Sequence, residues 1–121
     1  MDEKIGKLKF NYKIWLESED GQNILGDGKW RLLQAVEETG SLKGAIEKLD
    51  LSYRKTWDNL KKIEDNLGFH LINRTRGGIE GGSTTLTEEG KAIVQVFTQF
   101  HALHDMLFKK NSEEVLKTLY D

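Results

Sequence analysis

Cationic and amide side chains recur within residues 53–62 at helical spacing. If residues 53–67 form an α-helix, with about 100° between successive residues, one side of it is apolar and carries Tyr53, Trp57, Leu60 and Leu67. The opposite side carries Arg54, Lys55, Asp58, Asn59 and Lys62. Arg and Lys can donate to the acceptor edge of guanine, and Asn can pair with adenine, so this side predicts base contacts in a major groove. The alternative is an ordinary solvated helix face.

Two of these cations stand where an α-helix usually disfavours positive charge. Arg54 and Lys55 are the second and third residues after Ser52, the predicted N-cap, and a base in the first turn costs about 0.3–1 kcal/mol. A phosphate lying against the helix start would reverse this penalty, because backbone N–H groups, the helix dipole and both cations would meet one anion. The alternative is that Asp50 and Asp58 neutralise the pair locally.

Arginines and glycines further along the chain predict a second place for phosphate contacts. Arg74 and Arg76 lie two apart in a predicted strand, so both project from one face, and the four glycines within residues 77–83 let the backbone approach a phosphate closely. The full set of predicted DNA contacts is Ser41, Lys43, Ser52, Tyr53, Arg54, Lys55, Asn59, Lys62, Arg74 and Arg76. Within it, the predicted base contacts are Arg54, Lys55 and Asn59.

No arrangement of catalytic or cofactor-binding residues is recognisable in the sequence. The chain has no cysteine, which excludes disulfides, thiolate zinc sites and cysteine nucleophiles. The glycine-rich loop matches neither G-x-G-x-x-G nor a P-loop, and Glu88 and Glu89 after it would repel a nucleotide phosphate. His101 and His104 are spaced to share a metal ion with Asp105, but we expect them instead to lie beside a dimer seam. The prediction is a protein that is not an enzyme and has no cofactor and no metal site.

The elements that position these residues follow from the hydrophobic pattern, beginning at the N-terminus. Residues 7–17 alternate apolar with mostly polar side chains, which predicts a half-buried strand. Turn-forming residues follow, and residues 23–25 return as a short second strand. The expected element is an N-terminal β-hairpin.

A helical period replaces the alternation from residue 28 onwards and predicts three helices. Gly40 ends the first helix, and Ser41 caps a short second one. A tight turn at residues 50–51 follows, and Ser52 caps a third helix that Gly68 ends. Helices joined by so short a turn form a helix-turn-helix.

The rest of the chain predicts a β-hairpin wing and a long helix. Residues 70–76 and 84–86 are the wing strands, and Thr87 caps the fourth helix. The apolar arc of that helix is too wide for one neighbour to cover, which predicts a dimer interface. Its expected interface residues are Ile93, Val96, Phe97, Phe100, Leu103, His104 and Leu107. Residues 112–120 are expected to form a separate last helix opened by Glu113 and Glu114.

Composition and length fit one soluble domain. The 121 residues carry a net charge of −2 and contain no apolar stretch near the 20 residues needed to cross a bilayer, so we expect a cytoplasmic protein with no membrane contact. The predicted fold is mainly α with a small β component, a winged helix-turn-helix. Its parts are an N-terminal hairpin (7–25), the helix-turn-helix and wing (28–86) and dimerisation helices (87–120) within a single domain.

Several of these stretches together resemble the N-terminal DNA-binding domain of the ModE family of molybdate-responsive transcription regulators, which has a LysR-type winged helix. The matching stretches are residues 40–42, 52–58, 74–82 and 86–90. The resemblance runs from about Leu8 to the fourth helix, and implies that residues 52–58 lie on the recognition helix and that the double-glycine loop is the wing. Family members also carry C-terminal molybdate-binding domains. Residues 1–121 hold no such domain, so we expect a free-standing form without direct molybdate binding.

The hypothesis from the sequence is a homodimeric transcription regulator that binds double-stranded DNA sequence-specifically, with genes related to molybdate or other oxyanions as possible targets. The alternative is a winged helix used only for contacts with a partner protein, which the sequence pI of about 5.9 favours.

Overall fold

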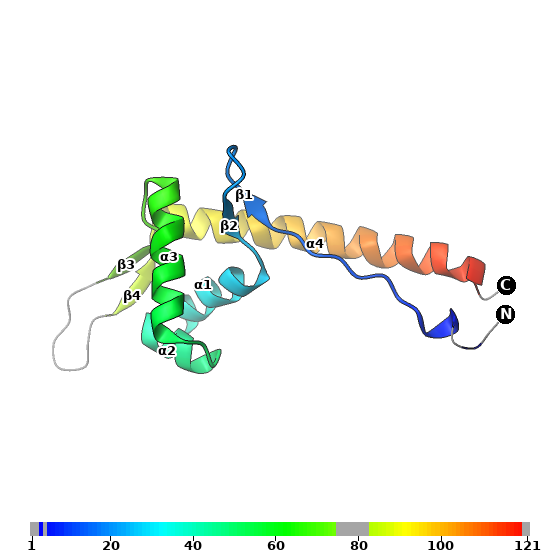
Figure 1. The fold of residues 1–121 in the computed structure, drawn as a ribbon, viewed down its shortest axis with the longest axis horizontal. Coiled ribbons are helices and arrows are strands. Elements are labelled where there is room, and N and C mark those ends of the chain that lie inside the picture. Colours follow the sequence, from blue (N-terminus) through cyan, green and yellow to red (C-terminus); the bar gives the residue numbers. More distant parts are fainter. Residues whose placement is uncertain (1–2, 4, 75–82, 120–121) are drawn as a thin grey trace.

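A computed structural model describes residues 3, 5–74 and 83–119. The molecule consists of a helix-turn-helix body and one long helix, α4, which extends well beyond it (Figure 1). A thin N-terminal segment runs along α4 toward the far end of that helix (Figure 1). The predicted mainly α fold with small β-hairpins is confirmed.

Local capping signals place the three helices of the body. Helix α1 (Asp27–Thr39) ends at Gly40, whose φ of 77° is left-handed, and helix α2 (Leu42–Lys48) is capped by the Ser41 hydroxyl, which accepts from the N–H of Gly44 at 2.8 Å. Helix α3 (Tyr53–Leu67) starts after Ser52 and ends at Gly68, which has a φ of 80°. These predicted boundaries are confirmed, because each depends on residues adjacent in the sequence.

Helices α1, α2 and α3 enclose one hydrophobic core together with the strands and the start of α4. Its largest fully buried side chains are Leu25, Leu32, Leu33, Leu60, Leu71 and Val36. Asp50, with a φ of 53°, turns the chain between α2 and α3, and the N–H of Leu51 closes the turn on the carbonyl of Ile46 at 3.0 Å. The core therefore fixes α3 while leaving its first turn at the surface.

The wing consists of strands β3 (Ile72–Arg74) and β4 (Thr84–Leu86), which pair antiparallel with Ile72 opposite Leu86. A buried carboxylate ties the wing to α3, because Glu64 accepts from the N–H groups of Leu71 at 2.7 Å and Ile72 at 3.3 Å. The predicted loop between the strands, including Arg76, lies outside the described residues.

Helix α4 (Glu88–Leu116) has 29 residues, which corresponds to roughly 43 Å at 1.5 Å per residue. A single 3-10 turn, η2 (Lys117–Leu119), follows. The prediction of a separate helix from residue 112 was wrong, because the Ser112 hydroxyl donates to the carbonyl of Lys109 at 3.2 Å and does not cap a new helix. Nowhere in the described part of the chain is a helix both long and apolar enough to span a membrane.

The N-terminal segment also differs from its prediction. A 3-10 turn, η1 (Ile5–Lys7), comes first, and only the short strands β1 (Leu16–Glu17) and β2 (Asn23–Leu25) pair. Residues 8–15 form no strand and run along α4 (Figure 1). Tyr12 packs its ring on Phe108, with 4.2 Å between ring centroids. Alternating apolar side chains here face a helix and solvent, so the expected strand was wrong over residues 7–15, whereas the pairing of its end with residues 23–25 is confirmed.

Candidate nucleic-acid interface

The first turn of α3 projects from the body and exposes most of its side chains. Thr56, Leu60 and Glu64 are the buried residues of α3, whereas Tyr53 is 55% exposed. The prediction that Tyr53 lies on the inner face was wrong, because the inward side of the helix begins only at Thr56. Its exposure leaves the aromatic ring free to contact a partner molecule beside Arg54.

Arg54 and Lys55 are exposed at this helix start and form no ion pair with another described residue. The alternative that Asp50 and Asp58 neutralise them is therefore not seen in the described part of the chain. The Ser52 hydroxyl accepts from the N–H of Lys55 at 3.4 Å, which is long for a hydrogen bond. Two cations without an ion pair in the described part of the chain, at the positive end of a helix with a long cap hydrogen bond, favour an anion at this place.

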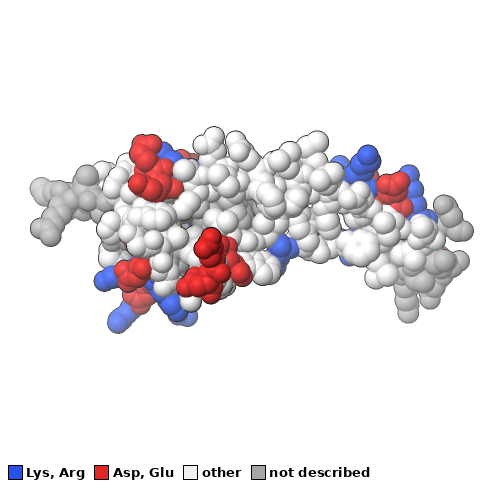
Figure 2. Space-filling model, turned by 90° about the horizontal axis from the view of Figure 1, so that it is seen from above, with Lys and Arg blue, Asp and Glu red and all other residues white. Residues whose placement is uncertain are grey.

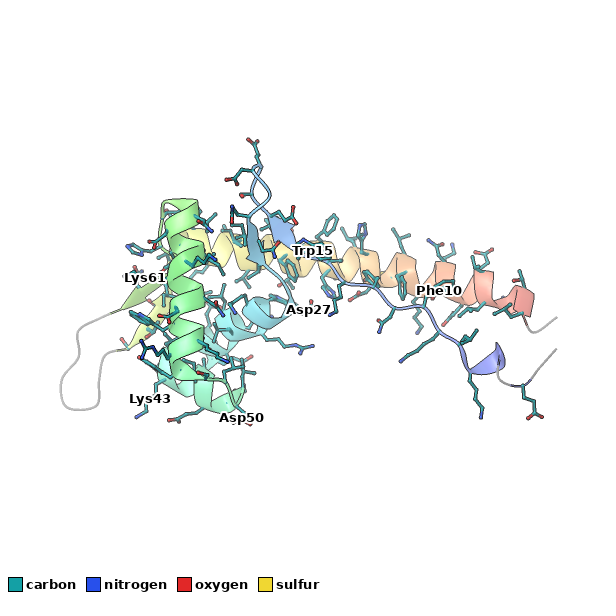
Figure 3. All side chains as sticks on the ribbon, in the orientation of Figure 1. Phe10, Trp15, Asp27, Lys43, Asp50 and Lys61 are labelled. Carbon is teal, nitrogen blue, oxygen red and sulfur yellow. The ribbon has the colours of Figure 1, made fainter. Side chains whose placement is uncertain are left out.

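Helix α2 adds Ser41 and Lys43 near the same end of the molecule. Lys43 is exposed, and Figure 3 shows it at the same end of the body as Asp50, in the turn that precedes α3. The Ser41 hydroxyl already serves as the α2 cap, so its role in a contact with DNA would be secondary. Lys48 on the same helix pairs with Glu38, and it thus contributes no free charge.

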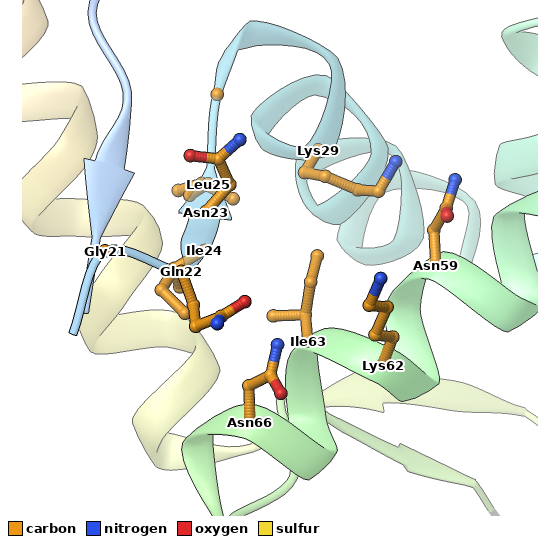
Figure 4. Close-up of a pocket in the computed structure, with 11 residues that line it drawn as sticks. Gly21, Gln22, Asn23, Ile24, Leu25, Lys29, Asn59, Lys62, Ile63 and Asn66 are labelled. Carbon is orange, nitrogen blue, oxygen red and sulfur yellow. The ribbon is translucent and has the colours of Figure 1, made fainter.

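Two of the predicted contacts lie further along α3 and face another element. Asn59 and Lys62 line a pocket between α3, the β1–β2 hairpin and the start of α1 (Figure 4). Lys61, which the sequence analysis did not select, is exposed next to them, and its outward position could have been found because it lies seven residues after Arg54 on the helical wheel. Arg76 and the side chain of Arg74 lie outside the described residues.

Comparison with known families gives one match, to the family of bacterial regulatory helix-turn-helix proteins of the lysR type, over residues 28–91. The match begins in α1 and ends just inside α4, so it contains the helix-turn-helix and both wing strands. The chain belongs to this family. The predicted LysR-type winged helix is confirmed.

Curated relatives of this LysR-type protein carry molybdenum-related or regulatory names. The chain is 30% identical over 107 residues to the molybdenum transport protein ModE of Azotobacter vinelandii, covering 88% of this chain and 39% of the relative. It is 33% identical over 79 residues to the transcriptional regulator ModE of Haemophilus influenzae, covering 61% and 31%. It is 32% identical over 77 residues to the molybdenum-pterin-binding protein MopA of Rhodobacter capsulatus, covering 64% and 29%. The chain thus spans about a third of the length of these relatives and resembles the DNA-binding domain of ModE proteins.

The long helix of this LysR-type protein carries an exposed apolar stripe. Val96 is 57% exposed, Phe100 48%, Leu103 63% and Leu107 55%, and in Figure 2 the upper middle of the molecule shows an area without charged side chains. Phe97 differs from the other predicted interface residues, because it is buried in its own core and packs on Trp30 at 5.3 Å between ring centroids.

The edges of the stripe hold the remaining predicted interface residues. Ile93 is half-buried and His104 is exposed, with its ring edge-on to Phe100 at 4.2 Å. Exposed Trp15, Met106 and Val115 add to the apolar surface. The sequence analysis did not select these three, because Trp15 and Val115 fell outside the predicted fourth helix and Met106 lies about 60° beyond Leu103 at the edge of the predicted arc.

His101 contacts side chains of α1 and of α4, and through Asp105 it is linked to the N-terminal segment. Its ring stacks on Trp30 at 5.0 Å, Nδ1 lies 2.7 Å from an oxygen of Asp105, and Nε2 lies 3.5 Å from an oxygen of Asp27. The Tyr12 hydroxyl also donates to Asp105. This hydrogen bond raises the pKa of Tyr12 from 10.0 to about 12 and lowers the pKa of Asp105. Among the described residues, no group of three or more potential ligands could hold a metal ion.

Proposed function

We propose that this protein binds double-stranded DNA sequence-specifically as a homodimer and thereby regulates transcription. The observation that carries the proposal is the start of α3, where Arg54 and Lys55 are exposed without an ionic partner. A helix N-terminus with free cations favours phosphate, and Arg and Lys side chains can then reach guanine in the adjacent major groove. The family match over residues 28–91 supports the same assignment.

The dimer would form through the apolar stripe of α4. A stable interface covers about 800 Å² on each partner. Helix α4 is roughly 43 Å long, and its four large stripe side chains, each about half exposed, would supply part of this area, with Trp15, Met106 and Val115 adding to it. Two-fold symmetry would present two copies of α3 to one duplex. Winged helix-turn-helix dimers of this kind contact half-sites about one helical turn apart, which predicts a pseudo-palindromic site.

The genes to test first are those concerned with molybdenum. The relatives named above include two with molybdenum in their names and one named as a transcriptional regulator. We infer that the regulated genes of this protein belong to molybdate or related oxyanion metabolism. Duplexes selected from a random pool by the purified protein would give the operator, and its positions in the genome would test this assignment.

The double substitution of Arg54→Ala and Lys55→Ala tests DNA binding by α3. We expect the selected duplex to lose its retardation in a gel-shift assay, with circular dichroism unchanged because both side chains are exposed. The wild-type affinity should fall steeply with salt. In the variant, any residual binding should have a salt slope smaller by about two.

The matched control removes two cations from the far end of α4 by substituting Lys109→Ala and Lys110→Ala, both exposed. Its net charge equals that of the α3 variant, but its affinity should stay close to the wild-type value. Equal losses in the two variants would indicate a general charge effect, and full binding by the α3 variant would refute the assignment of α3 as the recognition helix.

A further inference from the structure

A hollow of about 460 Å³ separates the β1–β2 hairpin from the outer side of α3 (Figure 4). Its lining comes from the β1–β2 hairpin and α1, which follow each other in the sequence, and from α3, which lies about 30 residues further on. Gln22 belongs to the hairpin, Lys29 to α1, and Asn59, Lys62 and Asn66 to the second half of α3. The first turn of α3, which carries Arg54 and Lys55, is not part of this pocket.

The described lining of the pocket contains cations and amides but no carboxylate. Lys29 extends from α1 toward α3, and Lys62 extends from α3 toward α1 and the hairpin (Figure 4). Neither lysine forms an ion pair with a described residue. Two ammonium groups directed into one hollow repel each other, and an anion between them would remove this repulsion. These cations gather in one place although the chain as a whole has a net charge of −2.

Uncharged donors complete the surroundings of these two lysines. The side-chain amides of Gln22, Asn59 and Asn66 can each offer an N–H group. Gly26, the N-cap of α1, also lines the pocket and has no side chain with which to cap that helix. Charged and neutral N–H donors from several sides are the groups that recognise an oxyanion, because each of its oxygens accepts hydrogen bonds.

We propose that this pocket binds a small ligand bearing a tetrahedral oxyanion, held between Lys29 and Lys62. The amides of Asn59 and Asn66 orient the oxygens, and the volume leaves room for the rest of a small molecule or for water. Such an anion would connect the hairpin, α1 and α3. Two sources supply this chemistry, a free oxyanion and a phosphate of the DNA backbone, and the proposal is that the ligand is a free one.

The test is a titration of the full chain without DNA, so its outcome does not depend on the proposed function. Inorganic phosphate, sulfate and molybdate are added separately at constant ionic strength, with chloride as the reference salt, while amide signals are followed by NMR. We expect saturable shifts at Lys29, Asn59, Lys62 and Asn66 with at least one of the three oxyanions. Shifts that stay linear with all three, or that chloride reproduces, would overturn the proposal.

Variants locate the site. Lys29→Gln and Lys62→Gln should each weaken the binding about tenfold, since each removes one charge-assisted hydrogen bond. Asn66→Asp, which places a carboxylate in the pocket, should abolish it. The control is Lys61→Gln, because Lys61 is exposed beside Lys62 but does not line the pocket. Equal weakening by the control would overturn the proposal, because it would indicate a general charge effect. Loss of duplex affinity in the Lys29 and Lys62 variants, with no oxyanion binding by the wild type, would also overturn it and would indicate a contact with a backbone phosphate of DNA.

Discussion

The first turn of α3 and the middle of α4 are both exposed helical surfaces, but they leave different chemistry without a partner. On α3, Arg54 and Lys55 are cations without an ion pair among the described residues. On α4, Leu103 and Leu107 are apolar side chains that are 63% and 55% exposed. The first surface would gain most from a polyanion and the second from another apolar surface.

Neither surface contributes much to holding the fold together. The core lies between the elements of the body, with Leu33 and Leu60 fully buried, and exposed side chains usually change stability by less than about 0.5 kcal/mol when substituted. Substitutions on α3 and on α4 should therefore separate two functions without unfolding the protein. This independence is what makes the comparison testable.

The largest effect is expected from Leu103→Glu in the α4 stripe. A carboxylate at the centre of a dimer interface must lose its hydration without gaining a partner, which costs several kcal/mol, so the dimer should weaken by at least a hundredfold, on the order of 2.7 kcal/mol. Light scattering should show a monomer at micromolar concentration, and affinity for a two-half-site duplex should fall with it. The variant of Arg54 and Lys55 should instead remain a dimer.

Gln95→Glu is the control for this substitution, because it adds the same charge to an exposed position of α4 outside the stripe. It should leave the dimer unchanged. If Leu103→Glu also stayed dimeric, the apolar stripe of α4 would not be the interface, and the proposed contrast between the two surfaces would be wrong.

A smaller effect, on stability and not on partners, is expected where the wing meets α4. A Cβ at Gly90 would lie 2.2 Å from the carbonyl oxygen of Leu71, so Gly90→Ala must displace backbone and should cost about 1–3 kcal/mol. Urea denaturation would measure the loss. Gly28→Ala in α1 is the matched control, since a Cβ there meets nothing within 4 Å and should stabilise the helix by up to about 1 kcal/mol. Equal changes in the two variants would contradict the close contact at Gly90.

The parts of the fold that could be predicted from sequence depend on neighbouring residues. Ser41 and Thr87 cap helices, and Gly40 and Gly68 end them, because a cap acts on N–H or C=O groups within three or four residues. The prediction of a cap at Ser112 was wrong because a serine hydroxyl has a second local choice. Inside a helix it can donate to a preceding carbonyl, as Ser112 does to Lys109. Only packing along the whole of α4 distinguishes the two cases.

The wrong or missing parts depend on contacts between distant segments. Alternation over residues 7–17 fits a strand, but it also fits an extended segment that packs its aromatic ring at Tyr12 on Phe108 of α4. A helical wheel places Tyr53 within about 20° of the buried Leu60. It does not show where along the axis of α3 the core begins, so it could not predict that the first turn projects into solvent. The pocket between Lys29 and Lys62 joins α1 to α3, and no spacing within either helix predicts it.

The smallest effect is expected at the junction of the N-terminal segment with α4, where the Tyr12 hydroxyl donates to Asp105. This hydrogen bond raises the pKa of Tyr12 from 10.0 to about 12. Because the folded-state pKa of Tyr12 is the higher one, the contribution of this contact to stability is fully present below pH 10 and is lost as the pH rises toward 12.

Ultraviolet absorbance of the phenolate should show one tyrosine titrating near 12, and this titration should be absent in Tyr12→Phe. In Asp105→Asn its pKa should move back toward 10.0, since the carboxylate is the main cause of the shift. An unchanged titration in Asp105→Asn would mean that the N-terminal segment does not dock on α4 through this pair, and that the surface of α4 available to a second subunit is wider than the stripe around Leu103.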